Sequence, residues 1–215
     1  MVQFATVEGN VIWENGAKGG SGINCDGVDD SIFRNNLLYN NHTSGISLYA
    51  ADGKHGSSHN KIYNNTIVMA ANSRYPINIP DGGGKAAPTD NTAENNILYT
   101  PDQNHGSILV SKPSLAGFHS DFNIVVNRFS KSNGNDTLTL TQWQALGFDL
   151  HSTIATPAQL FVDPPSNNYQ LKAGSPAMDH GVTLIDVLND ILGIGRPQGA
   201  GYDIGCYETT AVVLL

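Results

Sequence analysis

A two-part motif that returns every 26 to 31 residues constrains this chain more than any other feature of its sequence. One part of the motif is a short strand led by an asparagine. The asparagines that lead the repeated strand are Asn10, Asn36, Asn65, Asn96 and Asn123. Successive asparagines lie 26, 29, 31 and 27 residues apart. Self-similarity at a fixed period of this size is typical of folds that stack one small unit many times.

The other part of the repeat is a strand with apolar residues on alternate positions, which predicts one row of side chains that faces a core. This row begins at Ile23, Ile46, Ile77 and Ile108. No helical segment lies between the strands, so βαβ units, which need a crossover helix, are excluded. The sequence therefore predicts an all-β parallel solenoid of about four to five coils, because stacking buries each apolar row against its neighbour.

The repeated asparagines are interpreted as structural residues. At one bend in every coil, an asparagine amide can bind backbone groups and the asparagine of the next coil, and its backbone tolerates the left-handed region. We therefore expect an asparagine ladder rather than a row of catalytic groups.

The period is lost after about residue 128, so the sequence is divided into coils at 1–128 and an irregular C-terminal cap at 129–215, packed on the last coil. Within the cap, the segment DTLTLTQWQALG combines threonine caps, an amphipathic run and a glycine stop signal. This pattern predicts one short helix. The low charged fraction of 14% fits many short strands and tight turns better than long helices.

The coils resemble the right-handed, single-stranded parallel β-helix family typified by pectate lyase and its carbohydrate-active, bacterial relatives. The stretch GGSGINCDGVDDSIFRNNLLYNNHTSGISLYAADG carries most of this resemblance, and the segments at 160–181 and 199–208 resemble the closing segments of such proteins. The resemblance implies a right-handed solenoid, a polysaccharide or oligosaccharide partner, and secretion or cell-surface display of the parent protein. Fold alone does not fix the chemistry.

Several other classes of partner and location are disfavoured. The formal net charge of −8 argues against nucleic acid, which requires a clustered excess of Lys and Arg. No apolar run is long enough to cross a membrane, and the first residues do not resemble a signal peptide. Cys25 and Cys206 have no metal-binding spacing, and no phosphate-binding loop or nucleophile elbow is present.

Extra loop length marks the place where we expect a binding site. The distance from the strand isoleucine to the ladder asparagine is 13, 19, 19 and 15 residues in successive coils, so the two middle coils carry insertions, at 50–61 and 80–91. Loops on a rigid scaffold concentrate binding groups. Asp26, Asp52 and Asp81 each follow the same type of strand and precede a glycine. They are interpreted either as turn formers or as carboxylates that converge on one groove.

Two kinds of enzyme chemistry are compatible with these loops. A polysaccharide lyase needs a base and a cation, either Ca²⁺ or a basic side chain, that neutralises the uronate carboxylate. His55 or Lys61 is the candidate base, Arg74 the electrophilic partner, and Asp26 with Asp52 the candidate Ca²⁺ site.

A glycoside hydrolase would instead need two carboxyl groups about 5 to 10 Å apart. Asp52 with Asp81, or Asp26 with Asp52, are the candidate pairs.

Further residues are candidate substrate contacts: Tyr49 and Tyr75 beside the loops, where sugar rings stack on aromatic faces, and Lys54 and Lys85 within them. The alternative function is a non-catalytic carbohydrate-binding or adhesive module of a larger protein. Because the chain begins almost inside a coil, we also expect an exposed strand edge there and a homodimer formed through that end.

Overall fold

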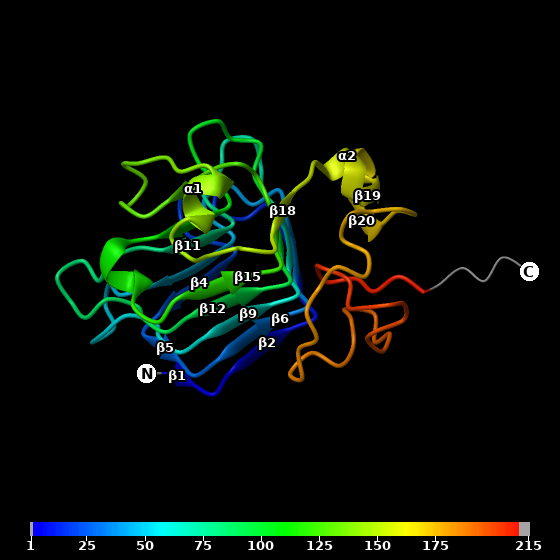
Figure 1. Cartoon of the computed structure of the whole chain (residues 1–215). Helices are drawn as coiled ribbons and strands as arrows, with labels where there is room; N and C mark the ends of the chain where they lie inside the picture. Colours follow the sequence, from blue (N-terminus) through cyan, green and yellow to red (C-terminus); the bar gives the residue numbers. More distant parts are fainter. Residues whose placement is uncertain (1, 211–215) are drawn as a thin grey trace, which may run out of the picture.

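The computed structural model describes residues 2–210 and is a right-handed parallel β-helix of about five coils, as the repeat and the resemblance predicted. Each coil contributes one strand to each of three parallel sheets, and Figure 1 shows the coils stacked from the blue N-terminal strands to the green ones. Sheet 1 contains β2 (Thr6–Glu8), β6 (Ile32–Arg34), β9 (Lys61–Tyr63), β12 (Thr92–Glu94) and β15 (His119–Asp121).

The other two sheets follow in chain order within each coil. Sheet 2 contains the asparagine-led strands β3 (Val11–Trp13), β7 (Leu37–Tyr39), β10 (Thr66–Val68), β13 (Ile97–Tyr99) and β16 (Ile124–Val125), and β18 (Thr153–Ile154). Sheet 3 contains β4 (Ile23–Asp26), β8 (Ile46–Tyr49), β11 (Ile77–Ile79), β14 (Ile108–Val110) and β17 (Phe129–Ser130). A short pair joins β1 (Val2–Gln3) to β5 (Val28–Asp29).

The interior of the solenoid is filled by rows of apolar side chains in register across the coils. Ile46, Ile77 and Ile108 are fully buried, which confirms the row predicted from the alternating pattern, and Ile23 in the first coil is only partly buried. Burial of stacked aliphatic rows is the main favourable term in folding of this kind.

The predicted asparagine ladder is present in every coil. In each step, the side-chain oxygen of one asparagine accepts hydrogen bonds from the backbone N–H and the side-chain amide of the asparagine one coil earlier, at 2.8 to 3.1 Å. The left-handed backbone that we assigned to the ladder residues belongs instead to the residue before each of them. These residues are Gly9, Asn35, Asn64, Asn95 and Phe122, with φ between 49° and 68°.

A second ladder, not predicted, runs along the bend before sheet 1. Ser31 N–H donates to the side-chain oxygen of Asn60 at 3.1 Å, and Asn60 donates through both its backbone and side chain to Asn91 at 3.0 and 3.1 Å. Asn60 and Asn91 therefore end the two insertions with a fixed bend.

The C-terminal third divides into two parts. Residues 139–152 pack over the last coil, where the predicted short helix is α1 (Leu140–Gln144) with a capping box from Thr139, and Trp143 is fully buried against Phe129. Asp149 ends the ladder by accepting hydrogen bonds from Asn123 Nδ2 and Ser152 Oγ at 2.8 and 2.6 Å.

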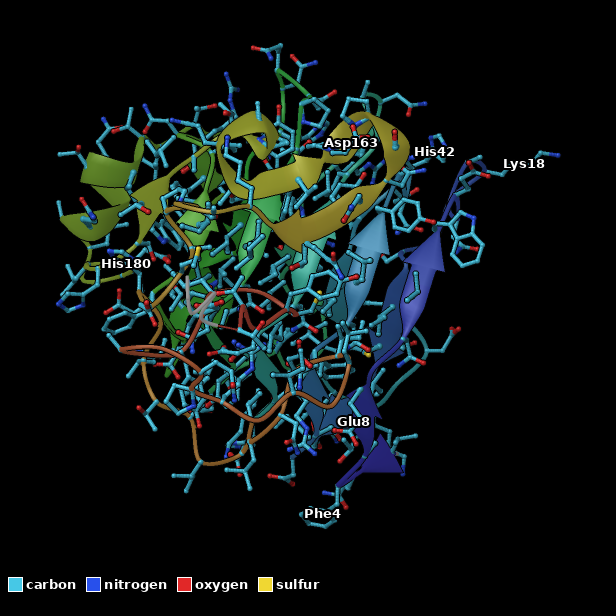
Figure 2. All side chains as sticks on the ribbon, turned by 90° about the vertical axis from the view of Figure 1, so that its right-hand side faces the viewer. Phe4, Glu8, Lys18, His42, Asp163 and His180 are labelled. Atoms are coloured by element: carbon cyan, nitrogen blue, oxygen red, sulfur yellow. The ribbon has the colours of Figure 1, made fainter. Side chains whose placement is uncertain are left out.

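We expected the segments at 160–181 and 199–208 to cover the end of the solenoid. Residues 157–210 do not cover it. They lie along the outer face of sheet 2, beside the coils in Figure 1 and across the strands in Figure 2. This part contains α2 (Pro157–Leu160) and the antiparallel pair β19 (Phe161–Asp163) and β20 (Asn168–Leu171); short 3-10 turns occur at Lys112–Leu115 and Pro164–Ser166.

A second apolar core joins this lateral segment to the coils. The outward side chains Leu37, Val68, Ile97 and Ile124 of sheet 2 pack against Phe161, Tyr169, Ile204 and Cys206, among others. A buried ion pair between Arg196 and Glu208, with an Nη1–Oε2 distance of 2.7 Å, lies within the segment, and Arg196 also donates to Asn35 of the second coil. The middle strands of sheet 2, β7, β10, β13 and β16, are thus covered on both faces, whereas Val11 and Trp13 of β3 are exposed.

Candidate functional site

The outer face of sheet 3 carries a polar row in its centre. Asn24, Ser47, Asn78 and Leu109 are consecutive register partners on β4, β8, β11 and β14. Asn78 Nδ2 donates to Ser47 Oγ at 3.1 Å, and Ser47 Oγ also lies 2.6 Å from Ser21 Oγ. Ser47 and Leu109 are buried, so this row offers a ligand the amides of the exposed Asn24 and the partly exposed Asn78, which are suited to binding hydroxyl groups.

Two adjoining hollows of about 550 and 350 Å³ lie along this face and share Arg74, Asn78 and Pro80, so they form one continuous groove. We call it the sheet 3 groove. Its further lining residues include Tyr49, Tyr75, Asp81, His105, Leu109 and Asn133. Its lining also contains Ala50 of the first insertion and Pro80 and Asp81 of the second.

Arg74 lies where the two hollows meet. Its side chain is exposed, and among residues 2–210 no carboxylate lies within ion-pair distance of its guanidinium. An exposed guanidinium that lines a groove and has no ion-pair partner can form a bidentate contact with a carboxylate of a ligand.

An Asp–His pair, which the sequence interpretation missed, lies beside Arg74. His105 Nδ1 is 2.8 Å from Asp102 Oδ1, and the His105 ring meets the Tyr75 ring edge-on with a centroid separation of 5.2 Å. Burial opposes ionisation of Asp102, but hydrogen bonds from the backbone N–H of Asn104 and from His105 outweigh it and lower the pKa of this carboxyl. Asp102 therefore holds the imidazole by one nitrogen and leaves Nε2 for a ligand.

The register shows how the proximity of Arg74 and His105 could have been predicted from the sequence. Arg74 precedes Ile77 by three residues and His105 precedes Ile108 by three, and Ile77 and Ile108 are direct partners in adjacent coils. Equivalent positions on neighbouring parallel strands are about 4.8 Å apart. Aligning the turns before the strands, rather than the loops after them, would have placed Arg74 and His105 together.

The three aspartates expected to converge have different surroundings. Asp26 pairs in register with Tyr49, so Asp52 lies three residues further along and is exposed on the first insertion. Asp81 lines the groove, where Asn133 Nδ2 donates to its Oδ2 at 2.7 Å and the backbone of Gly83 donates to its Oδ1 at 3.2 Å.

Asp26 anchors the first insertion. Its carboxylate accepts hydrogen bonds from the backbone N–H groups of Ala51, Asp52 and Gly53 at 2.8, 2.7 and 3.0 Å. These bonds, with a contribution from nearby Lys85, lower the pKa of Asp26. Within residues 2–210, no group of three or more His, Cys, Asp or Glu side chains is arranged to hold a metal ion.

Lys85 holds the same loop from the other side. Its ammonium group donates to the backbone carbonyls of Ala51 and Gly53, the latter at 2.7 Å. The two insertions also meet through a parallel bridge between His55 and Ala86. Lys85 is thus used within the protein, whereas Lys54 is exposed at the tip of the loop.

The two candidate bases lie outside the groove. Lys61 projects from sheet 1, and its Nζ is 2.6 Å from Asp186 Oδ2 of the lateral segment. His55 Nδ1 contacts the Gly56 carbonyl at 3.0 Å, and its Nε2 is 3.7 Å from the largely buried Asp29. The structure therefore does not bring Lys61 or His55 together with Arg74.

The two predicted tyrosines both line the groove but differ in exposure. Tyr49 is partly exposed, and its hydroxyl accepts a hydrogen bond from Asn24 Nδ2 at 2.8 Å. Tyr75 is only 4% exposed, so its ring supports His105 and offers no open face to a sugar.

Another hollow, of about 510 Å³, separates sheet 1 from residues 185–193. Its cation Arg34 is paired with Glu8 at 2.5 Å and donates to the Asp186 carbonyl, so it is already engaged. Of the two places, the sheet 3 groove is the better candidate because it offers an oriented imidazole and a cation that has no ion-pair partner within residues 2–210.

Comparison with known proteins identifies no family for this chain: no family model matches it, and no curated protein matches it. The resemblance to the pectate lyase-like family is therefore supported at the level of the parallel β-helix alone. Among the described helices, none is long and apolar enough to cross a membrane.

Proposed function

We propose that the sheet 3 groove binds a polysaccharide chain that contains uronic acid residues, and that Arg74 and His105 carry out β-elimination on it. One observation carries this proposal: an unpaired guanidinium and an Asp-oriented imidazole occupy equivalent positions of adjacent coils beside a row of amide and hydroxyl groups. The proposal keeps Arg74 in its predicted role and replaces His55 and Lys61 by His105 as the base.

The chemistry assigns one task to each group. Arg74 binds the uronate carboxylate and stabilises the negative charge that develops when the proton on the adjacent carbon is removed. His105 Nε2 accepts that proton while Asp102 holds the opposite nitrogen. The electron pair of the broken C–H bond forms a C=C bond, and the glycosidic oxygen on the next carbon leaves and takes up a proton. Tyr49 and the Asn78 amide bind the neighbouring sugar hydroxyls.

Elimination fits this groove better than hydrolysis by a carboxylate pair. A hydrolase needs two carboxyl groups on opposite sides of one bond. Asp81 lines the sheet 3 groove, whereas Asp26 ends β4 and anchors the first insertion, to which Asp52 belongs. Ca²⁺ enters this proposal as an assay condition only, because both carboxylate oxygens of Asp26 already accept backbone hydrogen bonds from the first insertion.

A second candidate function is a non-catalytic glycan-binding module of a secreted or cell-surface protein. The observation that favours it is that Asp26 and Asp81 are both engaged by donors of the protein itself. In that case Arg74, Tyr49 and the polar row would bind the glycan without turnover.

An assay on purified chain with a panel of uronate and neutral polysaccharides, with Ca²⁺ or with a chelator, tests the proposal. We expect absorbance from unsaturated products, its loss in Arg74→Ala and His105→Ala, and its retention in Lys112→Ala, which changes an exposed lysine outside the groove. Reducing ends without unsaturated product would instead support hydrolysis, and retention of glycan without any product would support the binding module.

A further inference from the structure

The bend between sheets 2 and 3 shortens in the last coil. Between the same register positions, the third and fourth coils have nine residues, 68–76 and 99–107, whereas the fifth coil has three, 126–128. A hollow of about 310 Å³ lies beside this short bend, lined by residues of the fourth and fifth bends, and we call it the bend hollow. It shares His105 with the sheet 3 groove and therefore adjoins it.

The backbone of the short bend is held in place by the fourth coil. Val126 N–H donates to Ser107 Oγ at 2.8 Å, and Ser107 N–H donates to the Arg128 carbonyl at 2.9 Å. Gly106 allows this close approach, because a Cβ at that position would collide with the Arg128 carbonyl oxygen. The base of the Arg128 side chain is thus fixed in the lining of the bend hollow.

Arg128 presents a second guanidinium that is not used in an ion pair. Its Nη1 donates to Thr137 Oγ1 at 3.4 Å, and in the part of the chain that the structure describes, residues 2–210, no carboxylate lies within ion-pair distance of it. The acidic residue in the lining, Asp102, is engaged elsewhere, since its Oδ1 accepts from Asn104 and His105. A partly buried guanidinium with open donors is suited to a carboxylate of a ligand.

The two arginines lie on either side of His105 along the solenoid. Arg74, His105 and Arg128 belong to the bends of three consecutive coils, before register partners of sheet 3. Because adjacent coils are about 4.8 Å apart, the third and fifth coils are separated by roughly 10 Å along the axis. A ligand that contacts both arginines must therefore extend along the axis and carry more than one negative charge.

We propose that the bend hollow is a second anion-binding subsite, in which Arg128 binds the carboxylate of a further uronate. This inference rests on the proposed function and specifies its substrate class: a run of uronates that lies along the solenoid axis, rather than a single uronate between neutral sugars. Arg128 binds the chain without taking part in the elimination. It raises the affinity for longer chains, because the second contact forms within a complex that the first has already made.

Binding titrations with oligouronates of two to five residues, from galacturonate and from alginate, test this subsite. They use His105→Ala, in which the ligand is not turned over, and absorbance of unsaturated products is measured separately on the unaltered chain. We expect the dissociation constant to fall by about tenfold or more once the oligomer is long enough to reach both arginines. Methyl esters of the same oligomers, which lack the charges, should show no such gain.

Arg128→Gln, added to His105→Ala, should abolish the gain with length and leave the affinity for the shortest oligomer unchanged. The matched control is Lys112→Gln, which removes an equal charge at an exposed position outside all three hollows and should keep the gain. Circular dichroism checks that both variants are folded.

The outcomes separate the subsite from the elimination. An equal gain with and without Arg128 would overturn the subsite, even if the unaltered chain forms unsaturated product. A gain that depends on Arg128, without any unsaturated product, would support the subsite and refute the elimination. The absence of binding by every oligomer would overturn both.

Discussion

The side-chain oxygen of Asn96 accepts hydrogen bonds from both the backbone N–H and the side-chain amide of Asn65, at 2.9 and 3.0 Å. Asn65 Nδ2 also donates to the backbone carbonyls of Phe33 and Tyr63, at 2.9 and 3.1 Å. One buried side chain therefore satisfies polar groups of three successive coils, and the ladder links the coils cooperatively.

Asn65→Ala should lower the free energy of unfolding by about 3 kcal/mol, because it leaves the Asn36 amide and the Phe33 carbonyl buried without partners. Chemical denaturation followed by circular dichroism measures this change. Asn10→Ala is the matched control, since Asn10 is exposed at the end of the same ladder, and it should cost less than about 1 kcal/mol. Equal effects at the two positions would show that the ladder does not act as described.

The anchoring of the first insertion should depend on pH through Asp26. Its pKa is lowered in the folded protein, so the stabilisation is present above the unfolded value, about 3.9, and is lost as the pH falls through the folded value. We expect the protection factors of the Ala51, Asp52 and Gly53 amides, measured against unstructured peptide at the same pH, to fall below pH 4, while the amide of Asn65 stays protected. Asp26→Asn should give the fast exchange at pH 7, and slow exchange in that variant would refute the anchoring role.

The lateral segment should depend on the Arg196–Glu208 pair, whose two side chains are fully buried. Arg196→Met leaves the Glu208 carboxylate without its cation and should destabilise the protein by about 3 to 5 kcal/mol. Thermal unfolding and limited proteolysis of residues 157–210 measure the effect.

The double variant Arg196→Met/Glu208→Leu should recover a large part of that loss, because no charge then remains buried alone. If the double variant is less stable than Arg196→Met, the pair contributes through other contacts.

The coils could be predicted from the sequence because two strand motifs return together at spacings of 26 to 31 residues. An asparagine leads the strand of sheet 2 in five coils, an isoleucine begins the strand of sheet 3 in four, and every asparagine after Asn10 accepts hydrogen bonds from the one before it. The second ladder was missed because one of its members is Ser31 and the others, Asn60 and Asn91, lie in segments that read as loops.

The sheet of the coil on which a given side chain or segment lies was harder to predict than the coil itself. Lys61 is the last residue of the predicted first insertion, yet it belongs to β9 of sheet 1 and lies away from the groove. The position of the lateral segment did have a signal: Leu37 and Leu38 are adjacent and both apolar, as are Ile97 and Leu98, so sheet 2 must be covered on both faces.

The central claim, that the sheet 3 groove is the glycan site, is tested most directly by mapping amide chemical shifts of the labelled protein as a panel of uronate oligosaccharides is added. We predict shifts at Ser47, Arg74, Asn78 and His105, and their loss in Arg74→Ala, in which the fold is kept. The absence of shifts with every member of the panel at millimolar concentration, or shifts confined to the hollow beside Arg34 and Asp186, would contradict the claim.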